Sequence, residues 1–105
     1  MVYEGGPMTE AMYYVLIALS NPNHGYQLME EIKKLSGGRI AMGPGTMYGV
    51  LTRMQKERLI IVIHDDGRRK TYQITDEGKT VLLQEYHRLK CLVDDGSYLE
   101  ENAHE

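Results

Sequence analysis

GPGTMYGVLTRMQKERLI, residues 43–60, has the pattern of a helix with one apolar stripe and a bare outer face. Gly43 is placed to cap this helix, and Pro44 stands at the first helical position, where its fixed φ is favourable. Apolar residues recur at i, i+3, i+4 and i+7, which gives a core-facing stripe of Met47, Val50, Leu51 and Met54. At about 100° per residue, the opposite face carries Gly45, Gly49, Thr52 and Lys56, flanked by Tyr48 and Arg53. The glycines on this face leave room for another molecule to approach the helix backbone.

Two helices are predicted before this stretch. Thr9 is placed to cap the first, whose body at residues 11–19, AMYYVLIAL, is apolar nearly all round. Such a helix must be covered on several sides, and in a chain of 105 residues a second subunit could supply part of the cover. After turn residues at 20–25, the second helix begins near His24 and ends at Gly37–Gly38. Its apolar face is Leu28, Met29, Ile32 and Leu35.

The hydrophobic period changes after residue 58, and this change predicts a hairpin. LIIVIHD at 59–65 and RRKTYQI at 68–74 flank Asp66–Gly67, which is a strong two-residue turn signal. A two-residue turn would pair Ile63 with Lys70, Ile61 with Tyr72 and Leu59 with Ile74. The result is a small ribbon with a basic tip, which must lean on the helices because an isolated hairpin is only marginally stable.

A last helix is predicted over residues 76–95. Thr75 is placed to cap it, and two acids follow at the positive end of its dipole. Leu82, Tyr86, Leu89 and Val93 recur at spacings of 4, 3 and 4, which makes a seam of the kind that a partner helix covers. Gly96 is expected to end this helix, and residues 96–105 are expected to form a flexible tail.

Charge is distributed unevenly along the chain. The net charge is −3, which argues against a nonspecific nucleic-acid binder, since such domains are strongly basic. Residues 33–70 nevertheless hold nine Lys or Arg against three acids, a local charge of +6, while the remainder carries −9. This asymmetry indicates a basic binding face on an otherwise acidic molecule.

The order of three helices followed by a hairpin with a cationic tip is typical of a winged helix-turn-helix. In that arrangement the third helix enters the major groove and the wing lies over the flanking backbone. The predicted fold is therefore mainly α with a small β-hairpin: a winged helix-turn-helix plus a C-terminal dimerisation helix. The residues expected to bind DNA are Gly45, Thr46, Tyr48, Gly49, Thr52, Arg53, Lys56, Arg68, Arg69 and Lys70. Arg53 could grip a guanine edge or a phosphate, and the sequence leaves both open.

Several motifs together resemble the PadR-like transcriptional regulators. They are HGY at 24–26, SGG at 36–38, PGTMY at 44–48, LTRM at 51–54, GRRKTYQIT at 67–75 and DEGK at 76–79. The resemblance runs from about Met8 to about Asp95 and implies a winged-helix homodimer that represses transcription. It also implies that a single C-terminal helix and the first helix build the dimer interface. On this basis the expected interface residues are Met12, Val15, Leu16, Leu82, Tyr86, Leu89 and Val93.

The predicted organisation is a flexible N-terminus at 1–7, a DNA-binding domain at 8–75, a dimerisation helix at 76–95 and a flexible tail at 96–105. The expected partners are double-stranded operator DNA, a second copy of the chain and a small-molecule effector that relieves repression. Two alternatives stay open: a small-molecule sensor at the dimer cleft, and a winged-helix module that binds protein and not DNA. An apolar outer face on the third helix would favour the second alternative, and residues 45–56 do not show one.

Other classes of function receive little support from the sequence. No apolar run approaches the roughly 20 residues of a membrane span, and the N-terminus lacks the pattern of a signal peptide, so a cytoplasmic protein with no membrane partner is expected. The four histidines and the single cysteine, Cys91, lack metal-ligand spacing, so neither a metal nor another cofactor is expected. The glycines at 43, 45 and 49 lack the preceding strand and the lysine of a phosphate loop. Catalytic groups are scattered, and a non-enzyme is predicted.

Overall fold

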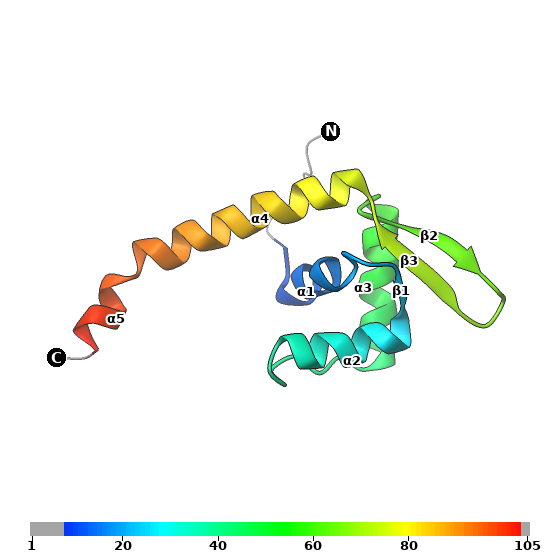
Figure 1. Ribbon diagram of the computed structural model, residues 1–105, viewed down its shortest axis with the longest axis horizontal. Coiled ribbons are helices and arrows are strands. Elements are labelled where there is room, and N and C mark those ends of the chain that lie inside the picture. Colours follow the sequence, from blue (N-terminus) through cyan, green and yellow to red (C-terminus); the bar gives the residue numbers. More distant parts are fainter. Residues whose placement is uncertain (1–7, 104–105) are drawn as a thin grey trace.

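The computed structural model describes residues 8–103 of the chain. Within this range the elements follow in the order α1 (Glu10–Ala18), β1 (Asn23–His24), α2 (Gly25–Leu35), α3 (Pro44–Lys56), β2 (Ile60–Asp65), β3 (Lys70–Ile74), α4 (Asp76–Asp95) and α5 (Tyr98–Asn102). Helices α1 to α3 gather under α4, the β2–β3 hairpin projects to one side as a wing, and the distal part of α4 projects to the other (Figure 1). The predicted flexible N-terminus at 1–7 lies outside the described residues.

The predicted helix caps are confirmed. The Thr9 hydroxyl accepts from the Met12 amide at 3.1 Å, and the Thr75 hydroxyl accepts from the Gly78 amide at 2.9 Å. Pro44 occupies the first position of α3, as expected. His24 caps α2, since its Nδ1 accepts from the Gln27 amide at 3.3 Å. These side chains satisfy backbone amides that would otherwise lack partners at the helix starts.

One hydrophobic core joins the three helices to the base of the wing. The predicted stripe of α3 supplies Met47, Leu51 and Met54, which are all buried, while Val50 is half-buried. The other large, fully buried side chains are Met12, Val15, Leu16, Leu19, Leu28, Ile32, Leu59 and Ile60. Leu35, which was predicted on the core face of α2, is instead 52% exposed, because the helix ends at this residue.

The prediction that α1 contributes Met12, Val15 and Leu16 to a dimer interface is wrong for these side chains. They are at most 1% exposed within the single chain. The cover that the sequence assigned to a second subunit comes from α2, α3 and α4 of the same chain, which all contact α1. The half-buried residues of α1, such as Tyr13 and Ile17, are the ones left toward the outside.

The sheet differs from the predicted hairpin in two respects. Asn23–His24, taken from sequence as turn material, forms β1 and pairs with β3, so the strand order is β1-β3-β2. Two of the predicted pairs are wrong by one residue: Ile60 and not Leu59 lies opposite Ile74, and Val62 and not Ile61 lies opposite Tyr72. A bulge between Val62 and His64 then shifts the register by one more residue, so that Asp65 and not Ile63 lies opposite Lys70. The strands are joined by a four-residue turn at 66–69 and not by Asp66–Gly67 alone.

Helix α4 has the predicted bounds, and Gly96 caps its end. The segment expected as a flexible tail carries the short helix α5 at its start. Its last two residues, 104–105, lie outside the described range.

Candidate nucleic-acid interface

The outer face of α3 is exposed along its length. Gly45, Thr46, Gly49, Thr52, Arg53 and Lys56 are all exposed, and Tyr48 is 49% exposed. Apart from each glycine's chain neighbours and the backbone of α3 itself, no atom of the described residues lies within 4 Å of the position that a Cβ would take at Gly45 or Gly49. The two glycines therefore make no packing contact that requires their small size. Their bare surface is free for the close approach of another molecule.

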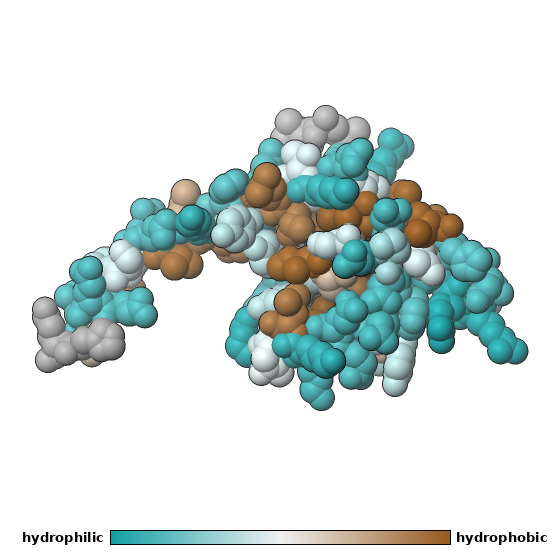
Figure 2. Space-filling model, viewed as in Figure 1, coloured by the Kyte–Doolittle hydropathy of each residue, from teal (hydrophilic) through white to brown (hydrophobic). Residues whose placement is uncertain are grey.

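Part of this face meets the wing around a polar hollow of about 330 Å³. Helix α3 contributes Tyr48 and Thr52, and the wing contributes Arg68, Arg69 and Lys70. The structure thus brings together five of the ten residues predicted to bind DNA. The others, Gly45, Thr46, Gly49, Arg53 and Lys56, lie outside this hollow. Figure 2 shows hydrophilic side chains at the outer end of the wing, at the right of the view.

The wing tip is held by the carboxylate of Asp66. Its Oδ1 accepts from the backbone amides of Arg68 at 3.0 Å and Arg69 at 2.8 Å. These bonds hold the pKa of Asp66 below its ordinary value. Gly67 takes a φ of 86°, which glycine adopts at low cost. Asp66 and Gly67 thus shape the four-residue turn, and the side chains of Arg68, Arg69 and Lys70 are left exposed.

Two of the polar side chains on α3 already have intramolecular partners. The Thr52 hydroxyl donates to the Tyr48 carbonyl at 2.8 Å, so its proton is used within the helix. Arg53 Nε donates to Glu57 Oε1 at 3.2 Å. The terminal nitrogens of the Arg53 guanidinium are not used by this ion pair, so a second acceptor can bind there.

Sequence reasoning missed five residues of this site. Four of them also line the hollow: Gln55, Asp65, Gly67 and Tyr72. Gln55 follows Tyr48 by seven residues and Thr52 by three, so helical spacing could have placed it on the same face. Gly25 contacts Tyr48 from α2, and no local pattern would have revealed this contact because it joins distant parts of the chain.

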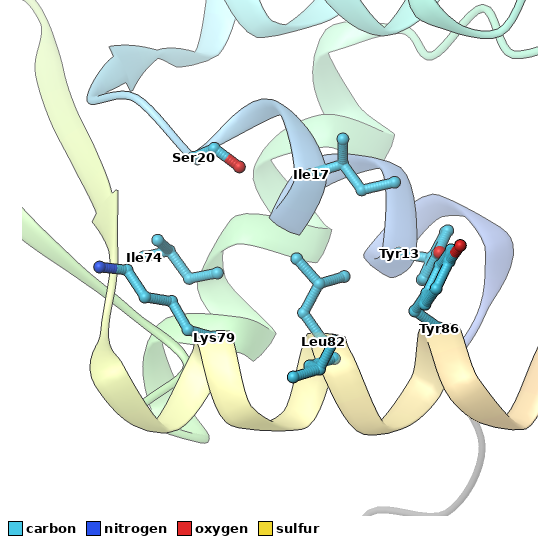
Figure 3. A pocket seen from close by; sticks show the side chains of 8 residues that line it. Tyr13, Ile17, Ser20, Ile74, Lys79, Leu82 and Tyr86 are labelled. Atoms are coloured by element: carbon cyan, nitrogen blue, oxygen red, sulfur yellow. The ribbon is translucent and has the colours of Figure 1, made fainter.

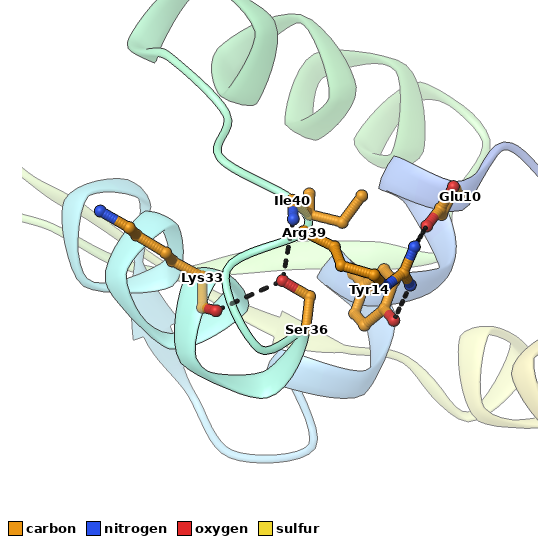
Figure 4. Close-up of polar contacts among 6 residues, drawn as sticks. All are labelled: Glu10, Tyr14, Lys33, Ser36, Arg39 and Ile40. Carbon is orange, nitrogen blue, oxygen red and sulfur yellow. Dashed lines mark hydrogen bonds and ion pairs between the residues drawn. The ribbon is translucent and has the colours of Figure 1, made fainter.

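The start of α3 is positioned by a fixed connection from α2. The Ser36 hydroxyl donates to the Lys33 carbonyl at 3.3 Å and accepts from the Ile40 amide at 2.9 Å (Figure 4). Arg39 reaches α1, where it donates to the Tyr14 hydroxyl at 2.8 Å and pairs with Glu10 at 3.0 Å. Both partners raise the pKa of Arg39. The connection thus ties the start of α3 to α1 as well as to α2.

The predicted dimer seam on α4 is only partly covered. Leu82 and Leu89 are half-buried, whereas Tyr86 is 49% and Val93 is 71% exposed. An apolar groove of about 490 Å³ lies between α4 and α1. Tyr13 and Ile17 of α1 face Leu82 and Tyr86 of α4 across it (Figure 3). Lys79 lies at the end of the groove near β3.

Residues 8–103 contain neither a cluster of metal ligands nor a membrane-spanning helix. Within that range, the histidine, cysteine and acidic side chains form no group of three that could hold a metal ion. None of the helices in the same range combines the length and the apolar character needed to cross a lipid bilayer.

Comparison with solved structures supports the winged-helix geometry. A PadR family transcriptional regulator from Eggerthella lenta is 29% identical with a TM-score of 0.69, and the match covers 83% of this chain and 74% of that one. Bacillus subtilis PadR, solved in complex with operator DNA, is 25% identical with a TM-score of 0.63 over 74% of this chain and 47% of that one.

Sequence relatives include longer proteins. An uncharacterized 37.1 kDa protein in transposon Tn4556 of Streptomyces fradiae is 32% identical over 104 residues, which is 90% of this chain and 30% of that protein. The transcriptional regulator YqjI of Escherichia coli is 32% identical over 56 residues, which is 53% of this chain and 27% of YqjI. The chain thus spans less than a third of the length of either relative.

The resemblance drawn from the sequence motifs is confirmed by the family comparison. The model of the transcriptional regulator PadR-like family matches residues 15–84, which is more than half of the 105 residues. Together with the fold, this match shows that the chain belongs to the PadR-like family of transcriptional regulators.

Proposed function

We propose that the chain is a homodimeric repressor that binds a pseudo-palindromic operator in double-stranded DNA. The observation that carries the proposal is the shared polar hollow, in which Tyr48 and Thr52 of α3 meet Arg68, Arg69 and Lys70 of the wing. A helix in the major groove and a cationic wing on the adjacent backbone need this juxtaposition. The operator complex of Bacillus subtilis PadR adds support from a related fold.

The chemistry of the two surfaces suits different parts of the duplex. Gly45 and Gly49 let the α3 backbone approach the groove, and the amides at its start favour a phosphate. Thr46, Arg53 and Lys56 are exposed on the same face, where they reach bases or phosphates. The wing arginines and Lys70 displace counterions from the flanking backbone, so affinity should fall steeply with salt.

The proposed dimer forms through the exposed part of the α4 seam. Tyr86, Leu89 and Val93 continue the apolar lining of the α1–α4 groove toward the free end of α4. A second copy of α4 would bury these side chains, which supplies the cover that the single chain lacks. Two recognition helices related by a two-fold axis would then enter major grooves about 34 Å apart.

An effector that relieves repression would act by binding two arrangements of the dimer unequally. The α1–α4 groove favours this part of the proposal, because apolar side chains and two tyrosines, Tyr13 and Tyr86, line it. It also supports the second candidate function, a small-molecule sensor at the dimer cleft. If a flat apolar compound saturates the α1–α4 groove and the affinity of the protein for DNA does not change, the sensor is favoured over the regulated repressor. We assign the chain no catalysis and place its action in the cytoplasm.

The decisive experiment is selection of bound duplexes from a random pool at two salt concentrations. We expect a dyad-symmetric consensus whose binding weakens steeply as salt rises. Arg69→Gln should reduce the slope of log affinity against log salt by about one unit. Lys90→Gln removes an exposed charge from α4 and should leave the slope unchanged. Failure to enrich any duplex with folded protein would overturn DNA binding and favour the sensor.

A further inference from the structure

The start of α2 contacts α3, the proposed recognition helix, through a glycine and a tyrosine. Gly25 is buried at the first position of α2. A Cβ added there would lie 2.9 Å from the Tyr48 hydroxyl oxygen and 3.0 Å from the ring carbon that bears it. The ring of Tyr48 therefore rests on the bare backbone of Gly25, in space that any side chain at this position would occupy.

The backbone of Gly25 does not itself require glycine. Among the described residues, positive φ angles at glycine occur at Gly37, Gly38 and Gly67, and Gly25 is an ordinary helical residue. Alanine is a better helix former than glycine, so the α2 backbone would accept it. The group that must give way is the far end of the Tyr48 side chain, which is half exposed and can rotate outward. Space for Tyr48 is thus what Gly25 provides.

Tyr48 stands where three elements of the proposed DNA surface meet. It lines the hollow with the wing residues Arg68 and Tyr72, and its hydroxyl contributes to the raised pKa of Tyr72, after burial. Strand β1, directly before Gly25, pairs with β3 of the wing, with Asn23 opposite Tyr72. A shift of the Tyr48 ring would therefore change the shape of the surface between the recognition helix and the wing.

We infer that Gly25 is a positioning residue for DNA binding, which acts by seating the Tyr48 ring between α2 and the wing. The inference rests on the proposed function, because it assigns Tyr48 to the DNA surface. Gly25 itself needs no contact with DNA. Gly25 leaves the space that the Tyr48 ring occupies. The Tyr48 hydroxyl is therefore already in position when the duplex binds.

The test is a double-mutant cycle with Gly25→Ala and Tyr48→Ala, measured on the duplex enriched from the random pool. We expect Gly25→Ala to weaken binding about fivefold when Tyr48 is present and to have no effect in the Tyr48→Ala background. The thermal midpoint of Gly25→Ala should be equal to or above that of the unmodified chain. Gly37→Ala is the matched control at the other end of α2: it should lower the midpoint, because Gly37 has φ 63°, and leave affinity unchanged.

A second readout needs no DNA. In chain labelled with 13C in its tyrosine rings, Tyr48→Phe identifies the Tyr48 signals, which Gly25→Ala should shift and Gly37→Ala should not. Unshifted signals would overturn the inference, as would an affinity loss that is equal in both Tyr48 backgrounds or absent from both. If the unmodified chain binds no duplex while the Tyr48 signals shift, the proposed function fails and the seating of Tyr48 stands.

Discussion

Arg58 holds a left-handed backbone conformation, with φ 64°, one residue beyond the C-cap of α3. The Leu59 amide donates to the Met54 carbonyl at 2.9 Å and the Arg58 amide donates to the Gln55 carbonyl at 3.1 Å. This is the Schellman pattern, in which the left-handed residue is usually glycine. Helix α2 ends in the same pattern with Gly37 at φ 63°. Arg58 therefore carries strain that Gly37 avoids.

We expect Arg58→Gly to raise the free energy of unfolding by about 0.5–1 kcal/mol, because glycine relieves this strain. Urea denaturation measures the change. Arg58→Ala is the control, since it removes the same charge and keeps a Cβ in the left-handed conformation. Equal stability of the glycine and alanine variants would show that Arg58 stores no backbone strain.

The sequence leaves two DNA contacts possible for Arg53, a base edge or a backbone phosphate. Its Nε is engaged by Glu57, which orients the guanidinium on the exposed face of α3. If it reads a base, Arg53→Ala should cost about 1–3 kcal/mol of binding and relax the preference at one operator position. Affinities for a panel of single-base operator variants distinguish the two cases. A loss that is uniform across the panel would assign Arg53 to a phosphate, and Lys90→Ala should change neither property.

At the scale of elements, the sequence predicted what depends on local signals. The caps of α1 and α4 and the buried stripe of α3 were all correctly placed. The wing register was not, because Asp66 bonds to the two amides after Gly67 and so lengthens the turn. The bulge at Val62–His64 and the pairing of β1 with β3 depend on contacts between distant residues. The spacing of apolar residues along the sequence does not predict such contacts.

Helix α4 is docked on the base of the wing through Gly78. A Cβ at this position would overlap the carbonyl oxygen of Leu59 and lie 2.8 Å from Ile74 Cγ1. Because a backbone carbonyl cannot move aside cheaply, Gly78→Ala should lower the free energy of unfolding by about 1–3 kcal/mol. Gly96→Ala is the control on the same helix, since its nearest contacts would be 3.7 Å away. Equal stability of the two variants in urea would contradict this docking.

Glu85 gives α4 a pH-dependent contribution to stability. Arg88 donates to both carboxylate oxygens, at 2.8 and 2.7 Å, and this holds the pKa of the buried Glu85 below its ordinary value. Because the pKa of Glu85 is lower in the folded than in the unfolded chain, its ionised form stabilises the fold at pH values above the unfolded pKa of about 4.3. This contribution is lost as the pH falls from there through the folded-state pKa. Glu85→Gln should therefore cost about 1 kcal/mol near neutral pH and less at about pH 3. Urea denaturation at both pH values measures this change in the free energy of unfolding. An equal change at both would show that Glu85 stabilises α4 through packing and not through its charge.

At the scale of the whole molecule, the family and the exposed outer face of α3 could be predicted from the sequence, but the distribution of buried surface could not. The nearly uniform apolar character of α1 was compatible with cover from a second subunit. The structure instead uses Met12, Val15 and Leu16 to join α1 to the rest of the core. An apolar surface that the single chain leaves exposed lies along α4, from the α1–α4 groove to Val93, and it is the surface that we propose for the partner.

The dimer proposal can be tested at Val93, because this side chain is 71% exposed in the single chain. Val93→Glu should leave the protomer folded but place an unpaired charge in the proposed interface, so that sedimentation gives the mass of one chain. Gln84→Glu adds the same charge about 180° around α4, on an exposed face, and should leave the dimer intact. A lost dimer in both variants would indicate a general effect of charge on α4. An unchanged dimer in Val93→Glu would place the interface elsewhere on the molecule.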